Sequence, residues 1–484
     1  MKRERLFLVF LVFILLFLPG VISAVVPQDS SVIVDQGLTN VLTRDIVRDS
    51  RGWLYAVYWT VFARGDVYCS RSTDNGRSWG RLARLNPHLA DIPALALGRG
   101  DTLYVIWRKC YTDTLGTDVF LSKYNGIEWS TPLNISNQHA LGGDFHNGTI
   151  AVDGNDHPHV AWDYDYSVYH SYHDGSGWTP PEYLGPGLYP TFSPDTGSAL
   201  HLVYYDINLS GNIAYRRWSS GIWGPEEDVN DRQNWASGAG VVGDFRGVPH
   251  GIWSASDSFG APSQAFYSKR QGGVWSPSIS ITPAVVHLMA TAISCDQSNR
   301  LYVAYQHPYP DTSLSHPQVF YTTFDGANWS PETLITSDTS RYHGRANLGY
   351  PVTSYGVDLL WTTYSPPPAY KDSVVYLRLP LVGSGVEGEK PVEPRGEGLQ
   401  FSVRSPVRSQ LVVRYFLPQS DIRNPKCVIS LYDLSGRLIA ALDEGVKPSG
   451  WHEVKCPLKL PSGIYFLRLE AGSVNLTRKL VVLR

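Results

Sequence analysis

The sequence is poor in charge, methionine and cysteine. Asp, Glu, Lys and Arg make up 18% of its 484 residues, and it has two methionines and five cysteines. Low charge together with 12% aromatic residues excludes a disordered chain or a long coiled coil. A net charge of −3 gives no overall positive field, so no nucleic-acid partner is expected. The cysteines are too few for a disulfide scaffold, although Cys427 and Cys456 lie in one segment and could pair.

Long apolar runs are also scarce. The only long one, Leu6–Leu18, follows a basic start and ends at Pro19. A helix of that length would span about 20 Å, which is shorter than a hydrocarbon core of about 30 Å. Residues 1–24 are therefore predicted to be a secretory signal peptide, with Ala24 as the small residue before the cut. No membrane span is expected in the mature chain.

Glycine, proline, tryptophan and tyrosine are abundant, and this predicts a β-rich, turn-rich protein. A tryptophan after a Gly-bearing turn recurs at intervals of 45–54 residues: Trp79, Trp129, Trp178, Trp223, Trp275 and Trp329. A short run ending in an aromatic residue recurs seven times: Leu54–Tyr58, Leu103–Trp107, Pro158–Trp162, Leu200–Tyr204, Pro249–Trp253, Leu301–Tyr305 and Val357–Trp361. These signals predict a unit of about four short strands that repeats along the chain.

Such a repeat is typical of a β-propeller, in which neighbouring sheets bury each other's faces. An array of β-sandwiches is the rival interpretation. The last unit, about residues 346–380, lacks an outer strand, whereas Ser31–Asp35 is a strand without a unit of its own. Closing the ring with that strand would remove an exposed edge. We therefore expect seven blades, with six as the alternative.

One turn matches a known motif. Residues 72–79, S-T-D-N-G-R-S-W, fit the Asp-box pattern S-x-D-x-G-x-x-W through Ser72, Asp74, Gly76 and Trp79. The chain from about 30 to 380 thus resembles the sialidase superfamily. The motif is expected to be structural: the aspartate binds turn N–H groups, the glycine takes a positive φ, and the tryptophan packs between blades.

Sialidase activity would require an arginine triad, a Tyr–Glu pair and an Asp acid. The stretch around Arg44 lacks the family's Arg-Ile-Pro. The glutamates between residues 40 and 380 all lie within four residues of a recurring tryptophan: Glu128, Glu182, Glu226, Glu227 and Glu332. We expect them on the outer strands of the blades, where they cannot reach the axis to polarise a tyrosine. The prediction leans against an enzyme, although a glycosidase built on two aspartates stays open.

Binding residues are expected in the loops that join each outer strand to the next inner strand, at the mouth of the channel. Histidines, acids, an arginine and aromatics gather there and suit a polar ligand such as a sugar. The candidates are His88, Asp91, His139, Asp144, His146, Tyr189, Trp235, His287, His343 and Arg345. Their spacing matches no metal motif, so neither a metal nor another cofactor is expected. The alternative is that they are ordinary polar loop residues.

Residues 383–398 read as a Gly- and Pro-rich linker after a propeller spanning 25–382. Beyond it, alternating apolar runs split by Ser-Gly turns predict about seven strands in a sandwich. The motifs, in order, are residues 405–407, 411–418, 429–437, 450–454, 461–469 and 478–484. Residues 399–484 thus resemble the Ig-like C-terminal sorting domain of the type IX secretion system.

That resemblance implies an outer-membrane bacterium, with the secretion machinery as a partner and export to the cell surface or medium. The function expected is non-catalytic binding of a glycan or a surface protein. The alternative is a glycan-active hydrolase of sialidase-like fold.

Overall fold

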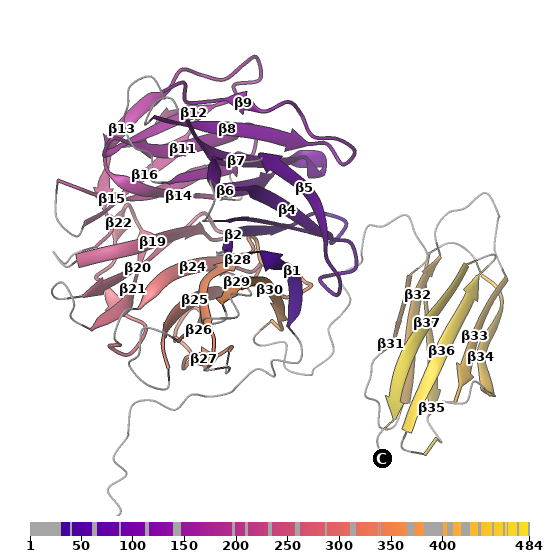
Figure 1. The fold of residues 1–484 in the computed structure, drawn as a ribbon. Helices are drawn as coiled ribbons and strands as arrows, with labels where there is room; N and C mark the ends of the chain where they lie inside the picture. The colour runs from indigo at the N-terminus through magenta and orange to yellow at the C-terminus, as the bar shows by residue number, and fades with distance from the viewer. Residues whose placement is uncertain are drawn as a thin grey trace, which may run out of the picture. The chain divides into compact units, whose positions relative to one another are not determined.

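The computed structural model of the chain is all-β and separates into two compact units, Met1–Gly385 and Val386–Arg484 (Figure 1). No α-helix occurs among the residues that the structure describes. These residues are 31–38, 41–60, 65–86, 89–111, 116–138, 147–195, 199–208, 212–230, 235–256, 262–285, 288–309, 316–336, 338, 340–364, 372–381, 400–403, 410–417, 426–433, 437–447, 450–457, 460–461, 463–471 and 474–482. The predicted signal peptide lies outside them.

The first unit contains seven antiparallel sheets in its described residues, numbered here 1 to 7. Sheet 1 has β2(Val41–Arg48), β3(Leu54–Thr60), β4(Val67–Ser72) and β5(Gly80–Asn86); sheet 2 has β6(Ala90–Leu97), β7(Leu103–Cys110), β8(Thr117–Tyr124) and β9(Leu133–Asn134); sheet 3 has β10(Gly148–Val152), β11(Pro158–Tyr164), β12(Ser167–Tyr172) and β13(Glu182–Pro186); sheet 4 has β14(Leu188–Pro194), β15(Leu200–Asp206), β16(Asn212–Ser219), β17(Ile222–Trp223) and β18(Glu227–Asp228).

Sheet 5 has β19(Trp235–Gly243), β20(Pro249–Ser256), β21(Ser263–Gln271), β22(Val274–Trp275) and β23(Ile279–Ser280); sheet 6 has β24(Met289–Cys295), β25(Leu301–Pro308), β26(Pro317–Phe324) and β27(Thr333–Leu334); sheet 7 has β28(Tyr342–Leu348), β29(Val357–Tyr364), β30(Asp372–Leu379) and β1(Val32–Leu38).

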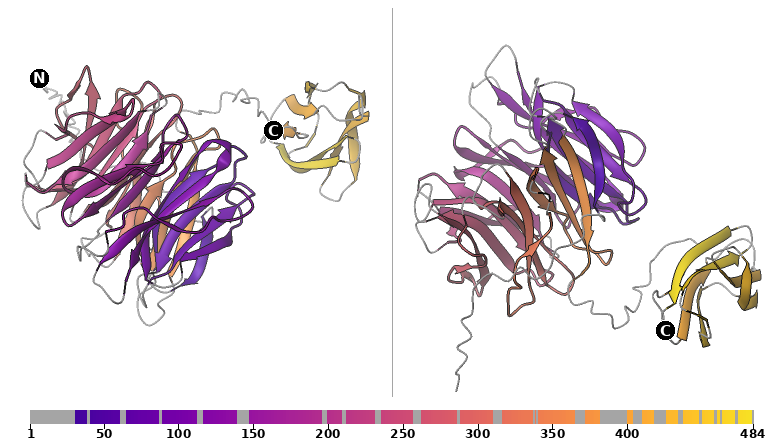
Figure 2. Two further views of the ribbon diagram at one scale, coloured as in Figure 1. Left: turned by 90° about the horizontal axis from the view of Figure 1, so that it is seen from above. Right: turned by 60° about the horizontal axis from the view of Figure 1, so that its bottom comes forward.

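The sheets close into a ring. The first strand of each sheet packs on the first strand of the next, and β28 of sheet 7 packs on β2 of sheet 1 (Figure 1). In Figure 2 the orange strands of sheet 7 lie beside the indigo strands of sheet 1. The N-terminal strand β1 pairs antiparallel with β30, as expected from the strand missing at the end of the repeat. Val32 lies opposite Tyr376, so strands from both ends of the ring share sheet 7.

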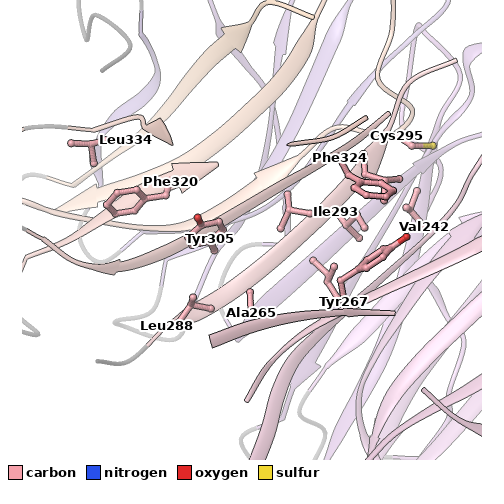
Figure 3. Close-up of a cluster of buried hydrophobic side chains, with 13 residues drawn as sticks. Val242, Ala265, Tyr267, Leu288, Ile293, Cys295, Tyr305, Phe320, Phe324 and Leu334 are labelled. Atoms are coloured by element: carbon pink, nitrogen blue, oxygen red, sulfur yellow. The ribbon is translucent and has the colours of Figure 1, made fainter. Parts of the chain in front are cut away.

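The recurring aromatic residues of the second strands form the core between sheets. Tyr58, Trp107, Trp162, Tyr204, Trp253, Tyr305 and Trp361 are all buried. Figure 3 shows one such cluster, in which Tyr305 and Phe320 of sheet 6 and Tyr267 of sheet 5 belong to one apolar core. Burial of side chains of this size is worth about 2–3 kcal/mol each, which explains why the sequence repeats them.

Four of the recurring tryptophans pack on a ring from the third strand of the preceding sheet. Trp79 contacts Tyr376 with ring centroids 5.3 Å apart, and the equivalent pairs are Trp223 with His170, Trp275 with Tyr215, and Trp329 with Tyr267. The tryptophans are only partly buried. Packing between neighbouring sheets is therefore the role of these residues.

The ring has two different ends. At the loop end, the first and third strands of each sheet begin; at the turn end, these strands finish. Tyr350 follows β28 at the turn end, and its hydroxyl donates to the carbonyl oxygens of Pro194 at 3.0 Å and Gly243 at 3.1 Å. Pro194 and Gly243 are the last residues of β14 and β19, the first strands of sheets 4 and 5. Tyr350 thus ties sheet 7 to two sheets across the axis of the ring.

A second repeat, which sequence analysis missed, governs the turn end. Five turns after a first strand carry Asp six residues before a buried His or Tyr: Asp49–Tyr55, Asp153–His159, Asp195–His201, Asp244–His250 and Asp296–Tyr302. In Asp244, for example, Oδ1 accepts the N–H groups of Arg246 and Val248, while Oδ2 lies 3.5 Å from His250 Nε2. The carboxylate therefore fixes both the turn and the ring behind it.

In three consecutive sheets the histidine of this repeat reaches a third-strand ring as well. His201 Nδ1 lies 2.9 Å from Tyr215 Oη, and His250 Nδ1 lies 2.8 Å from Tyr267 Oη. In sheet 3 the partner is a second histidine, because His159 Nδ1 lies 3.0 Å from His170 Nε2. Burial lowers the pKa of His159 to about 2 and also lowers that of His201, so both rings are neutral at pH 7.

The Asp-box turn lies where sheets 1 and 7 meet. Asp74 Oδ1 accepts the Ser78 N–H at 2.9 Å, and Gly76 has φ +83°. Next to it, Arg48 of sheet 1 forms a buried bidentate pair with Asp358 of sheet 7, at 2.9 Å and 2.5 Å. Arg48 also donates to Asn75 Oδ1 at 2.6 Å. The one complete copy of the motif therefore stands at the closure of the ring.

The C-terminal unit consists of two sheets around one apolar core. One sheet has β31(Gln400–Val403), β32(Gln410–Leu417) and β35(Gly450–Pro457); the other has β34(Leu438–Val446), β33(Lys426–Tyr432), β36(Gly463–Ala471) and β37(Val474–Val482). The buried residues alternate along the strands, as Leu411, Val413, Tyr415 and Leu417 do on β32. Cys456 is a free thiol, so its pairing with Cys427 is not formed.

Candidate functional site

Six of the ten predicted binding residues cannot be placed. His88, His139, Asp144, His146 and His287 lie outside the described residues, and only the backbone of Trp235 is described, in β19. The other four, Asp91, Tyr189, His343 and Arg345, lie on first strands near the loop end. The structure therefore puts these four in a common region of the ring, but their environments differ.

Asp91 is committed to an ion pair. Its two carboxylate oxygens accept from Arg108 Nε and Nη2, each at 2.6 Å. Both side chains are partly exposed. The pair can present guanidinium and carboxylate edges to a ligand, although the carboxylate is neutralised by its partner.

His343 is a correction to the prediction. It belongs to β28 and is only 2% exposed, so it does not contact a ligand at the surface. Burial lowers the pKa of its imidazole to about 4, which keeps the ring neutral at pH 7. The sequence signal was wrong because His343 lies just before a bulge. Arg345, two residues further on, has a left-handed backbone there and is exposed, whereas His343 stays in the regular part of β28 and is buried.

Tyr189 and Arg345 are the predicted residues that the structure exposes. Each occupies a β-bulge in its first strand, with φ +57° for Tyr189 and +55° for Arg345. Left-handed backbone at a bulky residue costs about 1–2 kcal/mol. Each is held by a hydrogen bond from its own N–H: Tyr189 to Asp163 Oδ2 at 2.6 Å, and Arg345 to Gln306 Oε1.

Sequence analysis missed a third exposed residue, Tyr166. It forms with Asp165 the two-residue turn between β11 and β12, with φ +47° at Asp165 and +60° at Tyr166. Such a turn favours Asn-Gly because both residues need positive φ. Tyr166 is nevertheless 56% exposed, so packing does not explain the bulky residue. The two-residue spacing between Tyr164 and Ser167 was the signal that could have revealed it.

Tyr166 and Tyr189 lie close together at the loop end. The carbonyl of Tyr166 accepts the Gly187 N–H at 2.9 Å, two residues before Tyr189. Tyr189 is 50% exposed, and Tyr183 on β13 of the same sheet is 56% exposed. Partial burial, with the nearby Asp163 carboxylate, raises the pKa of Tyr189, so its hydroxyl remains a donor at neutral pH. Tyr166 and Tyr189, called the tyrosine pair below, offer aromatic faces with polar tips.

Two of the glutamates near the recurring tryptophans contact a tyrosine of their own sheet. Tyr204 Oη donates to Glu226 Oε2, and Tyr305 Oη donates to Glu332 Oε2 at 2.9 Å. Both tyrosines are fully buried, and burial together with the neighbouring carboxylate raises their pKa. They are neither accessible nor ionisable as nucleophiles near neutral pH. Both pairs therefore stabilise the interior of their sheets.

Within the described residues, no group of three or more His, Cys, Asp or Glu side chains is arranged to hold a metal ion. Among the same residues, no helix is long and apolar enough to cross a membrane.

The comparison with protein families concerns the C-terminal unit. Residues 405–483 match the family model described as the secretion system C-terminal sorting domain. A search of curated proteins gave no match. Among solved structures, the chain is similar to an ulvan lyase, from a new family of polysaccharide lyase, bound to -[GlcA(1-4)Rha3S]-. That likeness has a TM-score of 0.55 at 9% identity and covers 72% of this chain and 95% of that one.

The chain is also similar to a fungal alcohol oxidase of the AA5 family in complex with copper. The TM-score is 0.51 at 12% identity, covering 93% of this chain and 98% of that one. At such identities the likeness concerns the fold alone. Together with the closed ring of sheets, it identifies the first unit as a β-propeller, and the family match identifies residues 405–483 as a secretion system C-terminal sorting domain.

Proposed function

We propose that the chain is an exported seven-bladed propeller that binds a polysaccharide at the loop end without catalysing a reaction on it. The observation that carries this is the tyrosine pair: two exposed aromatic residues, each held in an unfavourable left-handed backbone conformation. Such conformations persist where the surrounding structure imposes them and cluster at functional sites. Aromatic rings with polar tips bind the apolar face and the hydroxyls of a sugar.

Arg345 extends the same surface toward charged groups on the ligand. Its guanidinium lies on an exposed bulge of sheet 7, at the same end of the ring as the tyrosine pair. A guanidinium binds carboxylate or sulfate oxygens in a bidentate manner. The similar ulvan lyase holds a ligand with both uronate and sulfate groups, and this supports an acidic polysaccharide as the class to test first.

Binding is favoured over hydrolysis because two of the described carboxylates at this end are already engaged. Asp91 is paired with Arg108, and Asp163 accepts the backbone N–H groups of Asn147 and Tyr189. A glycoside hydrolase needs two carboxyl groups about 5–10 Å apart on either side of the bond that is cleaved. The sialidase-like hydrolase remains the second candidate, since Asp144 belongs to the same loops.

The sorting-domain match implies secretion or attachment to the cell surface. We divide the chain accordingly into a signal peptide 1–24, a propeller 25–382 closed by β1 as the outer strand of its last blade, a linker 383–398, and an Ig-like sorting domain 399–484. In this division the C-terminal unit engages the secretion machinery and the ring engages the ligand.

Affinity electrophoresis in gels containing ulvan, pectin or a neutral glucan tests this function. Tyr166→Ala and Tyr189→Ala should each weaken retention by an acidic polysaccharide about tenfold or more, which corresponds to about 1.4 kcal/mol. Tyr355→Ala is the matched control, because Tyr355 is similarly exposed but lies at the turn end. Equal retention of all variants, or the release of new reducing or unsaturated sugar ends, would contradict non-catalytic binding at this site.

A further inference from the structure

A cavity of about 520 Å³ opens at the turn end between sheets 3 and 4, away from the tyrosine pair. Its walls come from the β10–β11 turn, the end of β12 and the β16–β17 turn. The polar or aromatic residues that line it include Asp153, Asn155, His157, Tyr172, Asp174 and Arg217. The volume falls within the range of about 300–1,000 Å³ that is usual for small-molecule sites.

Two of these side chains have unused hydrogen-bonding capacity. Arg217 is exposed on β16 and makes no ion pair or side-chain hydrogen bond to any described residue, although Asp153 and Asp174 line the same cavity. Tyr172 Oη likewise has no hydrogen-bond partner among the described residues. An arginine that does not pair with two nearby acids leaves all of its N–H donors to a ligand.

Contacts within the protein hold several side chains of the cavity wall in place. The Tyr172 ring stacks on His159 with centroids 4.9 Å apart and meets the edge of Trp218 at 5.0 Å. Asp153 is fixed because its Oδ1 accepts the N–H groups of Asn155 and His157. A site whose side chains are already held loses little conformational entropy when it binds.

The side chains that line the cavity include hydrogen-bond donors and acceptors and carry charges of both signs. Arg217, Asn155 and Tyr172 donate, whereas the Asp174 carboxylate accepts. Hydrogen bonds from Ser176 lower the pKa of Asp174 to about 2, so it is ionised at neutral pH. An anionic ligand would meet the carboxylates of Asp153 and Asp174, and a cationic ligand would meet Arg217. Vicinal hydroxyls of a neutral ligand can accept from the arginine and donate to a carboxylate.

We infer that this cavity is a second carbohydrate site, which takes one neutral pyranose unit between Arg217 and Asp174, with Tyr172 as the aromatic wall. The inference goes beyond the proposed function, since no residue of the loop end takes part. Two sites at opposite ends would let one molecule contact two chains of a polysaccharide, or two points on one chain.

The test is isothermal titration of the full mature chain with methyl glycosides of glucose, galactose and rhamnose, beside glucuronate and glucosamine as charged comparisons. At least one neutral glycoside should bind more tightly than both charged sugars. Arg217→Ala and Asp174→Asn should each weaken that binding about tenfold, with unchanged melting temperatures. Arg246→Ala is the matched control, because Arg246 is exposed in the equivalent turn end of sheet 5.

Tyr166→Ala distinguishes this site from the loop end, because it should leave monosaccharide binding unchanged while weakening polysaccharide retention. The inference is overturned if no neutral glycoside binds, if Arg217→Ala binds as well as the unmodified chain, or if Tyr166→Ala abolishes the monosaccharide signal. None of these results would by itself affect the proposal for the loop end.

Discussion

The two ends of the ring use similar residues in opposite ways. At the turn end, buried tyrosines, histidines and aspartates contact one another inside the protein, as in the Asp244–His250–Tyr267 series. At the loop end, Tyr166 and Tyr189 are exposed on strained backbone. Buried polar contacts hold the sheets in place, whereas exposed groups held in costly conformations are available to ligands. Substitutions of the buried polar residues at the turn end should therefore destabilise the ring, whereas substitutions of Tyr166 or Tyr189 should affect binding alone.

The largest effect is expected at the closure of the ring. Arg48→Ala leaves the Asp358 carboxylate buried without its bidentate partner, and such a loss costs about 3–5 kcal/mol. Denaturant unfolding of the unmodified chain and of the Arg48→Ala variant measures this loss in the free energy of unfolding. Arg84→Ala is the control, since Arg84 pairs with Asp66 at the surface and its loss should hardly move the midpoint. Equal midpoints for both variants would mean that the Arg48 pair does not hold the ring closed.

The second largest effect is expected from acid, which should destabilise the ring. The pKa of His343 is about 4 in the folded chain and about 6.5 when unfolded, so between these values only the unfolded state takes up the proton. Stability is complete above pH 6.5 and falls as the pH drops toward 4, by an amount on the order of 3 kcal/mol for this group. Melting temperatures across this window measure the slope, and His343→Phe should reduce it.

The C-terminal unit is the internal comparison for acid sensitivity. All histidines except His452 lie in the first unit, and the core of the C-terminal unit is apolar. Its melting transition should therefore shift less between pH 6.5 and 4 than that of the ring. A larger acid shift in the C-terminal transition would place the sensitivity outside the buried histidines.

A smaller effect separates two glycines of equivalent turns. A Cβ at Gly76 would lie 2.1 Å from Cε1 of Tyr376, whereas one at Gly126 meets nothing within 4 Å, and both have positive φ. Gly126→Ala should cost about 1 kcal/mol for backbone strain alone, and Gly76→Ala about 1–3 kcal/mol more because sheet 7 must shift. Thermal unfolding compares them. Similar losses would show that the Asp-box turn is no more tightly packed than its degenerate copies.

Sequence reasoning reached the features that depend on local pattern. The recurring aromatics predicted the buried second strands, the unmatched Ser31–Asp35 predicted the pairing of β1, and period-two alternation predicted the strands of the C-terminal unit. These succeed because burial and strand pairing follow from the order of residues along one strand.

It failed where contacts join residues that are distant along the chain or depend on one backbone angle. Glu332 reaches Tyr305 because a short outer strand folds back on its own sheet, and His343 is buried next to the exposed Arg345 because of a bulge. The Asp-x5-His/Tyr repeat was present in the sequence, but its members vary too much to stand out. Tyr166 does not stand out in the amino-acid composition, because what distinguishes it is the positive φ of its backbone.

The substitution Tyr166→Gly tests the difference between the two ends most directly. Glycine suits the second position of the Asp165–Tyr166 turn, so the variant should be as stable as the unmodified chain or up to about 1 kcal/mol more stable. It should at the same time lose retention by an acidic polysaccharide about tenfold. A variant that binds as before, or that loses binding only because it unfolds more easily, would contradict the assignment of the loop end to ligand binding.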